Sequence, residues 1–91
     1  MNSRAHLFIH GDVIGVGFRA WTLRNARQLN LSGWVRNADD KTVETVLEGE
    51  KEKIEEIVAL CHKGPEVSWV EKVEVKWEEG TSEFAGFEIR Y

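Results

Sequence analysis

The chain has 91 residues, enough for one hydrophobic core and too few for two ordinary domains, so we expect residues 1–91 to form a single domain. Hydrophobic residues make up 42% of the chain and charged residues 31%, with four Trp and four Phe, and this balance excludes a disordered protein. The formal net charge of −4 argues against a general nucleic-acid-binding protein, whose affinity would depend on a basic face.

A single cysteine and the absence of long apolar stretches set the expected compartment. One cysteine cannot form an internal disulfide, and no stretch has the apolar length of a signal peptide core or a membrane helix. We therefore expect a cytoplasmic protein with no membrane partner. Because the chain is acidic overall, any phosphate-binding site must be formed locally by a few residues.

The first predicted element is a strand over residues 4–13, RAHLFIHGDV. Its odd-numbered residues are apolar or small and share one face, which we expect helices to cover. His6 and His10 fall on the opposite face, and no carboxylate or thiol is spaced along the sequence to complete a metal site with them. We interpret them as solvated strand histidines and predict no metal site.

Three glycines lie in the stretch 11–19, GDVIGVGFR, which runs from the end of this strand to a predicted helix. Glycines allow backbone N–H groups to turn inward around an anion, because no Cβ blocks the conformation or the approach of the ligand. The helix start adds unpaired N–H donors and the positive end of a dipole. Arg19 adds a planar, charged group that matches a phosphate or carboxylate. The stretch predicts an oxyanion-binding loop, although a tight turn with a solvated arginine also fits the pattern.

A helix and a strand hairpin come next. Residues 19–29 show apolar side chains at helical spacing. Residues 31–37, LSGWVRN, and 42–49, TVETVLEG, are predicted strands joined by a polar turn over 38–41. Gly33 lies on the inner side of the first of these strands, and we expect its missing side chain to let the first helix approach the sheet.

The most regular helical pattern covers residues 50–63, and Gly64 followed by Pro65 predicts its end. Cys61 lies on the apolar face of this helix. We interpret it as a small core residue, because no activating neighbour supports a catalytic thiol.

Two further strands complete the pattern. Residues 69–77 alternate so that Trp69, Glu71 and Val73 share the face expected to be half-buried, and residues 84–91 form a short final edge strand. The order strand, helix, strand, strand, helix, strand predicts an α+β fold, the ferredoxin-like split βαβ sandwich, with a four- to five-stranded antiparallel sheet and both helices on one face. Many functions share this fold, so it does not define the activity.

Three motifs resemble those of the acylphosphatase family in order and spacing: GDVIGVGFR at 11–19, GWVRN at 33–37 and VLEG at 46–49. The resemblance runs from the first strand to the closing FEIRY, essentially the whole chain. It implies a ferredoxin-like domain that hydrolyses the carboxyl–phosphate bond of a small acyl phosphate, without cofactor, metal or covalent intermediate. Inorganic phosphate is then product and competitive ligand, and we expect a monomer.

The resemblance also implies the site residues. Arg19 binds the phosphoryl group and Asn37 positions the attacking water. The phosphate oxygens are held by the backbone N–H groups of Ile14, Gly15, Val16, Gly17 and Phe18. Without the resemblance, Asn37 is better explained as a turn residue at the end of a hairpin. Arg19 could also be a solvated arginine on the surface. However, the start of a helix is an unfavourable place for a cation, and this itself suggests that Arg19 has a functional role.

Two residues depart from the family's usual GRVQGVGFR: Asp12 replaces a basic residue and Ile14 replaces Gln. The charge of Asp12 is expected to weaken phosphate binding, most strongly at low ionic strength. Ile14 removes a polar side chain but keeps its N–H group.

Two other functions stay open. An oxyanion-binding domain without turnover would use the same loop. RNA binding through the sheet face would need aromatic residues in a basic context, and the acidic balance opposes it despite Phe8 and Trp34.

Overall fold

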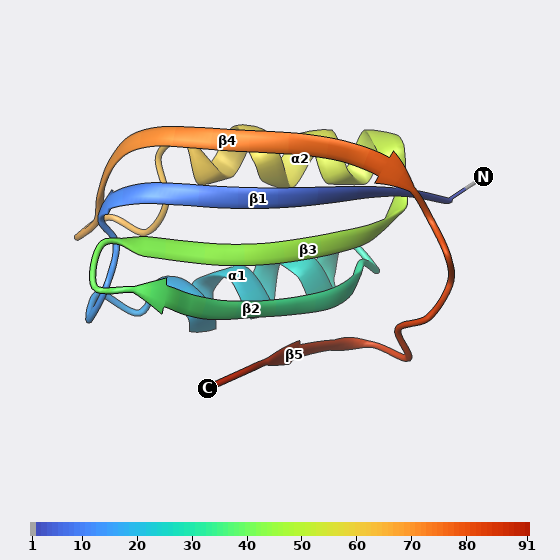
Figure 1. Cartoon of the computed structure of the whole chain (residues 1–91), viewed down its shortest axis with the longest axis horizontal. Helices are drawn as coiled ribbons and strands as arrows, with labels where there is room; N and C mark the ends of the chain where they lie inside the picture. The colour runs from blue at the N-terminus through green and yellow to red at the C-terminus, as the bar shows by residue number, and fades with distance from the viewer. Residues whose placement is uncertain (1) are drawn as a thin grey trace.

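A computed structural model of the chain describes residues 2–91 and shows one five-stranded sheet with two helices on the same face (Figure 1). Across the sheet the strand order is β4-β1-β3-β2-β5. The ferredoxin-like α+β fold predicted from the sequence is confirmed. In chain order the elements are β1 (Asn2–Asp12), α1 (Phe18–Gln28), β2 (Ser32–Asp39), β3 (Thr42–Glu50), α2 (Lys51–Cys61), β4 (Trp69–Glu79) and β5 (Phe87–Ile89).

The last strand makes the sheet mixed at one edge. The four long strands pair antiparallel as predicted, whereas β5 pairs parallel with β2, with Phe87 opposite Gly33. The cause is the path of the chain. Because β4 lies at the other edge of the sheet, residues 80–86 cross to β2 at the end where β2 begins, and β5 then runs in the same direction as β2 (Figure 1).

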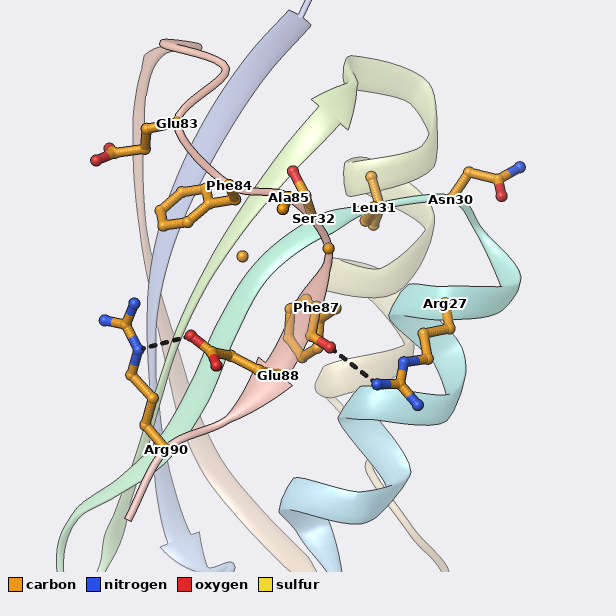
Figure 2. Close-up of a pocket in the computed structure, with 12 residues that line it drawn as sticks. Arg27, Asn30, Leu31, Ser32, Glu83, Phe84, Ala85, Phe87, Glu88 and Arg90 are labelled. Atoms are coloured by element: carbon orange, nitrogen blue, oxygen red, sulfur yellow. Dashed lines mark hydrogen bonds and ion pairs between the residues drawn. The ribbon is translucent and has the colours of Figure 1, made fainter.

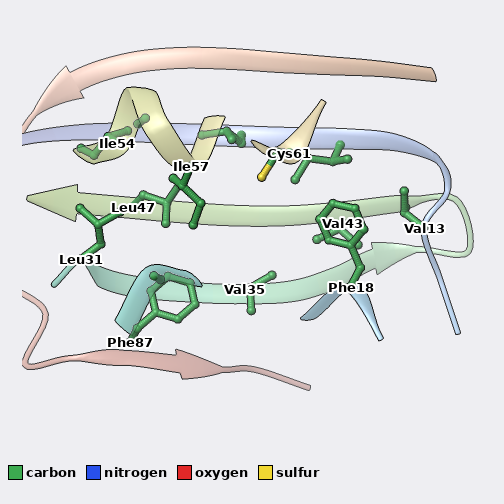
Figure 3. Close-up of a cluster of buried hydrophobic side chains, with 14 residues drawn as sticks. Val13, Phe18, Leu31, Val35, Val43, Leu47, Ile54, Ile57, Cys61 and Phe87 are labelled. Atoms are coloured by element: carbon green, nitrogen blue, oxygen red, sulfur yellow. The ribbon is translucent and has the colours of Figure 1, made fainter. Parts of the chain in front are cut away.

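The core lies between the sheet and the two helices (Figure 3). The odd-numbered residues of β1 face the helices, as the alternation predicts. Full burial of each large apolar side chain contributes about 1.5–3 kcal/mol, so this layer fixes both helices on the sheet. The buried cluster comprises Ala5, Leu7, Ile9, Val13, Phe18, Ala26, Leu31, Val35, Val43, Leu47, Ile54, Ile57, Cys61 and Phe87.

Both helices form where the apolar spacing predicts them, and each has 11 residues. After α2, Gly64 adopts the left-handed conformation, with φ of 68°, and its N–H group donates to the carbonyl of Leu60 at 2.8 Å. This confirms the predicted stop. Within residues 2–91 neither helix has the length and apolar character needed to cross a membrane.

The start of β4 differs from the prediction. The register between β1 and β4 shifts between His10 and Gly11, so one extra residue of β4 is accommodated there as a bulge. The bulge reverses the alternation at the start of the strand. Val70 therefore packs against the core, whereas Trp69 and Glu71, which we expected on the inner face, are exposed.

The role predicted for Gly33 is also corrected. Its φ is 131°, and a Cβ atom built there would lie 1.9 Å from the carbonyl oxygen of Val46. The missing side chain therefore accommodates the backbone of the adjacent strand β3, and not the approach of α1. The conformation and the contact both require glycine.

We predict that Gly33→Ala lowers the free energy of unfolding by about 2–4 kcal/mol, because β2 and β3 must separate and the backbone is strained. The matched control is Gly86→Ala, where a Cβ meets nothing within 4 Å. The control should cost about 0.5 kcal/mol or less. Urea denaturation of both variants measures the difference, and equal stabilities would contradict this account of Gly33.

Candidate active site

A pocket of about 170 Å³ opens between the β1–α1 loop and the end of β2. Arg19 and Asn37 come from different elements, yet the structure brings both to this pocket. The pocket is lined by Val13, Gly15, Gly17, Phe18, Arg19, Ala20, Asn37, Ile89 and Tyr91.

The backbone of the loop alternates in conformation. Gly15 and Gly17 have φ of 75° and 78°, whereas Ile14, Val16 and Phe18 do not have positive φ. Alternation of this kind turns successive N–H groups into one concavity, which is the geometry of an anion nest. A Cβ at Gly15 or Gly17 would meet nothing within 4 Å, so there is room for a side chain at both positions. Glycine is favoured here because of the positive φ.

The donors of this loop have no partner in the backbone. Within residues 2–91, the N–H groups of residues 14–18 form no backbone hydrogen bond, and the first one in α1 runs from Trp21 to Gly17 at 3.0 Å. Gly17 caps α1 without a side chain, and no acidic residue lies in the first helical turn. The loop and the helix start therefore present unsatisfied donors and a positive dipole end to an anion.

Two predicted loop residues contribute no side chain to the pocket. Ile14 and Val16 are half-buried and pack against the core. Their packing anchors the loop from within. It also gives the apolar side chain at position 14 a structural role.

Arg19 is half-buried in the first turn of α1, and its guanidinium carbon lies 4.9 Å from the centroid of the Tyr91 ring. None of the ion pairs formed within the described chain involves Arg19. The aromatic face stabilises the cation without neutralising it, so its charge is available to an anionic ligand.

Asn37 lies near the end of β2, paired with Val43 on β3, where the register shifts before Asp39. Such bulges reorient side chains beside functional sites. The turn contact expected of a hairpin residue is made by Asp39, whose carboxylate accepts the N–H group of Lys41 at 2.9 Å. Asn37 is therefore not needed for the turn, and it lines the pocket.

Sequence reasoning missed the wall formed by Ile89 and Tyr91. These residues reach the pocket because β5 runs parallel to β2. The alternation of Phe87, Ile89 and Tyr91 in the closing FEIRY was the available signal, but it does not tell which strand they join.

The strand histidines are paired, which corrects the prediction that they are simply solvated. His6 Nε2 lies 2.7 Å from a Glu44 oxygen, and His10 Nε2 lies 2.8 Å from a Glu74 oxygen. The reason is that β3 and β4 flank β1 and present carboxylates on the same face. Among residues 2–91 no three His, Cys, Asp or Glu side chains are grouped as metal ligands.

Comparison with known proteins agrees with this geometry. The Acylphosphatase family model matches residues 5–89. An acylphosphatase from Roseiflexus sp. (strain RS-1) is 48% identical over 96% of this chain and 94% of its own length. The crystal structure of acylphosphatase from Bacillus subtilis superposes with a TM-score of 0.93 at 30% identity, covering 98% of this chain and 99% of that one. HypF from T. kodakarensis matches with a TM-score of 0.82 at 31% identity over 96% of this chain, but this is only 12% of that protein.

The fold and the pocket define a ferredoxin-like domain with a glycine loop of unpaired N–H groups at the start of its first helix. The matches extend over almost the whole chain. The chain therefore belongs to the acylphosphatase family.

We predict that Cys61 takes no part in catalysis. It has no exposed surface, and burial raises the pKa of its thiol to about 12, so the reactive thiolate is scarce at neutral pH. A disulfide reagent such as dithionitrobenzoate at pH 8 should react with the thiol only after unfolding. Rapid modification of the folded protein with loss of activity would overturn this assignment.

We predict that Asp12→Arg strengthens phosphate binding. Asp12 is exposed at the end of β1, next to Val13 of the pocket wall, so its charge acts on the site through solvent. The expected gain is about two- to fivefold at low ionic strength and declines as salt is added. Titration with phosphate at two salt concentrations measures it, and an affinity that does not rise contradicts the prediction.

Proposed function

We propose that the chain hydrolyses acyl phosphates to a carboxylate and inorganic phosphate, with the phosphoryl group held by the loop of residues 14–18 and by Arg19, and the water held by Asn37. The activity accords with the full-length likeness to acylphosphatases. The observation that carries the assignment of roles is the shared pocket, in which Arg19, Asn37 and the glycine loop converge.

The first requirement of the reaction is to balance the charge on the phosphoryl oxygens. The N–H groups of residues 14–18 and the dipole of α1 provide fixed partial charges, and these groups need no reorganisation during the reaction. Arg19 adds a full charge and two parallel N–H donors that match a phosphoryl group. Together they stabilise the charge that spreads over the equatorial oxygens in the transition state.

The second requirement is a water in line with the bond that breaks. The Asn37 amide offers one acceptor and two donors, so it is suited to orient such a water. The water oxygen bonds to phosphorus while the bond from phosphorus to the carboxyl oxygen breaks, and the electron pair leaves with the carboxylate. A carboxylate needs no proton to depart, so the site can work without a general acid. A phosphate oxygen of the substrate can take the water proton.

We also propose that the chain acts as a monomer in the cytoplasm. All groups assigned to the reaction come from one chain, so no second copy is needed to complete the site. The single cysteine is buried and unpaired, as suits a reducing compartment.

A second candidate is oxyanion binding without turnover. It is favoured by the likeness to full-length HypF, whose crystal structure is of a phosphate- and nucleotide-bound form and in which the matching domain is 12% of the chain. Asp12 and Ile14 add to it, because both depart from the usual loop of the family. The two candidates share the pocket and differ in whether the bound phosphoryl group is transferred to water.

The proposed roles predict different kinetic defects in the two side-chain variants. With benzoyl phosphate as substrate and a chelator present, Arg19→Ala should lower kcat/KM by at least about 100-fold and weaken inhibition by phosphate. Asn37→Ala should lower kcat by at least about 100-fold but leave phosphate inhibition close to that of the wild type.

The control is Arg24→Ala, which removes an exposed arginine from the same helix without touching the pocket. It should retain wild-type kinetics. The opposite outcome is that folded wild-type protein binds phosphate but leaves benzoyl phosphate to decay at its spontaneous rate. That result would establish oxyanion binding without turnover instead.

A further inference from the structure

Glu48 is a buried carboxylate far from the pocket that the proposed mechanism does not use. Its side chain is 1% exposed. It lies opposite Ser32 on β2, whereas Val43 lies opposite Asn37. Five residues along a strand correspond to about 17 Å, so Glu48 sits near the opposite end of the sheet from the site.

Glu48 binds the loop that connects β4 to β5. Its two carboxylate oxygens accept the backbone N–H groups of Thr81 at 3.0 Å and of Ser82 at 2.6 Å. Arg4 on β1 donates to the same carboxylate at 3.1 Å and also contacts the side chains of Thr81 and Glu83. We call Glu48, Arg4, Thr81 and Ser82 the Glu48 clasp.

The carboxylate of Glu48 is ionised within the clasp. Burial by itself would raise the pKa of Glu48, but the hydrogen bonds that it accepts from the loop and from Arg4 outweigh this effect, and the pKa lies below its usual value. The other anchors of the loop run mainly through Arg4, which also lies 4.8 Å from the centroid of the Phe84 ring. Glu83 and Phe84 lie along a groove of about 620 Å³ that borders this segment (Figure 2).

After the loop, β5 is held by the burial of Phe87 in the core, by its pairing with β2 and by three hydrogen bonds at its ends. The carbonyl of Gly86 accepts the N–H group of Gly33 at 2.9 Å, the N–H group of Arg90 donates to Val35 at 2.8 Å, and the guanidinium of Arg27 donates to the carbonyl of Phe87 at 3.2 Å (Figure 2). A slip of one residue would exchange the two faces of β5. Ile89 and Tyr91 would then leave the pocket, and Arg19 would lose its aromatic neighbour.

We infer that Glu48 is a positioning residue of the active site, because its clasp helps to set where β5 begins and thereby holds Ile89 at the pocket and Tyr91 beside Arg19. Four residues, 83–86, separate Ser82 from Phe87, so anchoring the loop at Ser82 limits which residue can reach the position opposite Gly33. This role rests on the proposed function, since it requires Arg19 to bind phosphate.

The test is a double-mutant cycle between Glu48→Gln and Tyr91→Ala, read as the dissociation constant of inorganic phosphate from amide chemical shifts of residues 14–18. Each single change should weaken binding about two- to fivefold, the range of an exposed cation–π contact. The double variant should bind phosphate about as tightly as the single variant with the lower affinity. The reason is that Glu48 acts by positioning Tyr91, so its loss has no further effect once Tyr91 is removed.

Glu44→Gln is the matched control. It is the same substitution on the same face of β3, at another buried carboxylate paired with an arginine, but Glu44 makes no contact with the loop of residues 80–86. It should lower stability and show no coupling to Tyr91→Ala. If Glu48→Gln does not fold, Arg4→Lys, which keeps the charge and loses the planar fork, should show the same coupling in smaller measure.

The inference would be overturned if Glu48→Gln lowered stability but left the affinity for phosphate unchanged. It would also be overturned if the losses of affinity in the two single variants simply added in the double variant. Arg19→Ala separates this failure from that of the proposed function. If Arg19→Ala weakens phosphate binding and Glu48→Gln does not, the positioning role alone fails. If Arg19→Ala leaves the affinity unchanged, the proposed function fails and the positioning role with it.

Discussion

The left-handed backbone at Gly15 and Gly17 is the constraint on which the site depends. The N–H groups of the loop have no backbone partners, and alternation of this kind turns successive N–H groups toward one concavity. The loop keeps this conformation because the core holds both of its ends, through Val13 after β1 and Phe18 at the start of α1. The hydrophobic core therefore does more than stabilise the fold, since it fixes the donors before any ligand arrives.

An acyl phosphate suits a small domain with few polar groups. Its leaving group is already a weak base, so the protein has to supply fixed charge and a positioned water and little else. In the proposed mechanism Arg19 and the loop provide the charge, and Asn37 is free for the water because Asp39 makes the turn contact of the hairpin. Ile89 and Tyr91 also line the pocket, and we infer that their placement depends on contacts at the distant end of the sheet.

The alternation of β1, the stop at Gly64 and the glycine loop were predictable, because each depends on residues close together in the sequence. The family motifs also named Arg19 and Asn37, two of the side chains that line the pocket. The bulge beside Gly11, the contact of Gly33 with Val46 and the pairing of His6 with Glu44 were not predictable. They depend on which strands become neighbours and in which register. The wall from β5 was missed for the same reason, since its direction follows from the crossing of residues 80–86.

The most direct test of the account is the fate of the water oxygen. Benzoyl phosphate is hydrolysed by the wild-type protein in oxygen-18-labelled water, and both products are analysed by mass spectrometry. If water held by Asn37 attacks phosphorus bound at Arg19, the label appears in inorganic phosphate and benzoate stays unlabelled. Label in benzoate would show attack at the carbonyl carbon and would contradict the roles assigned to the pocket.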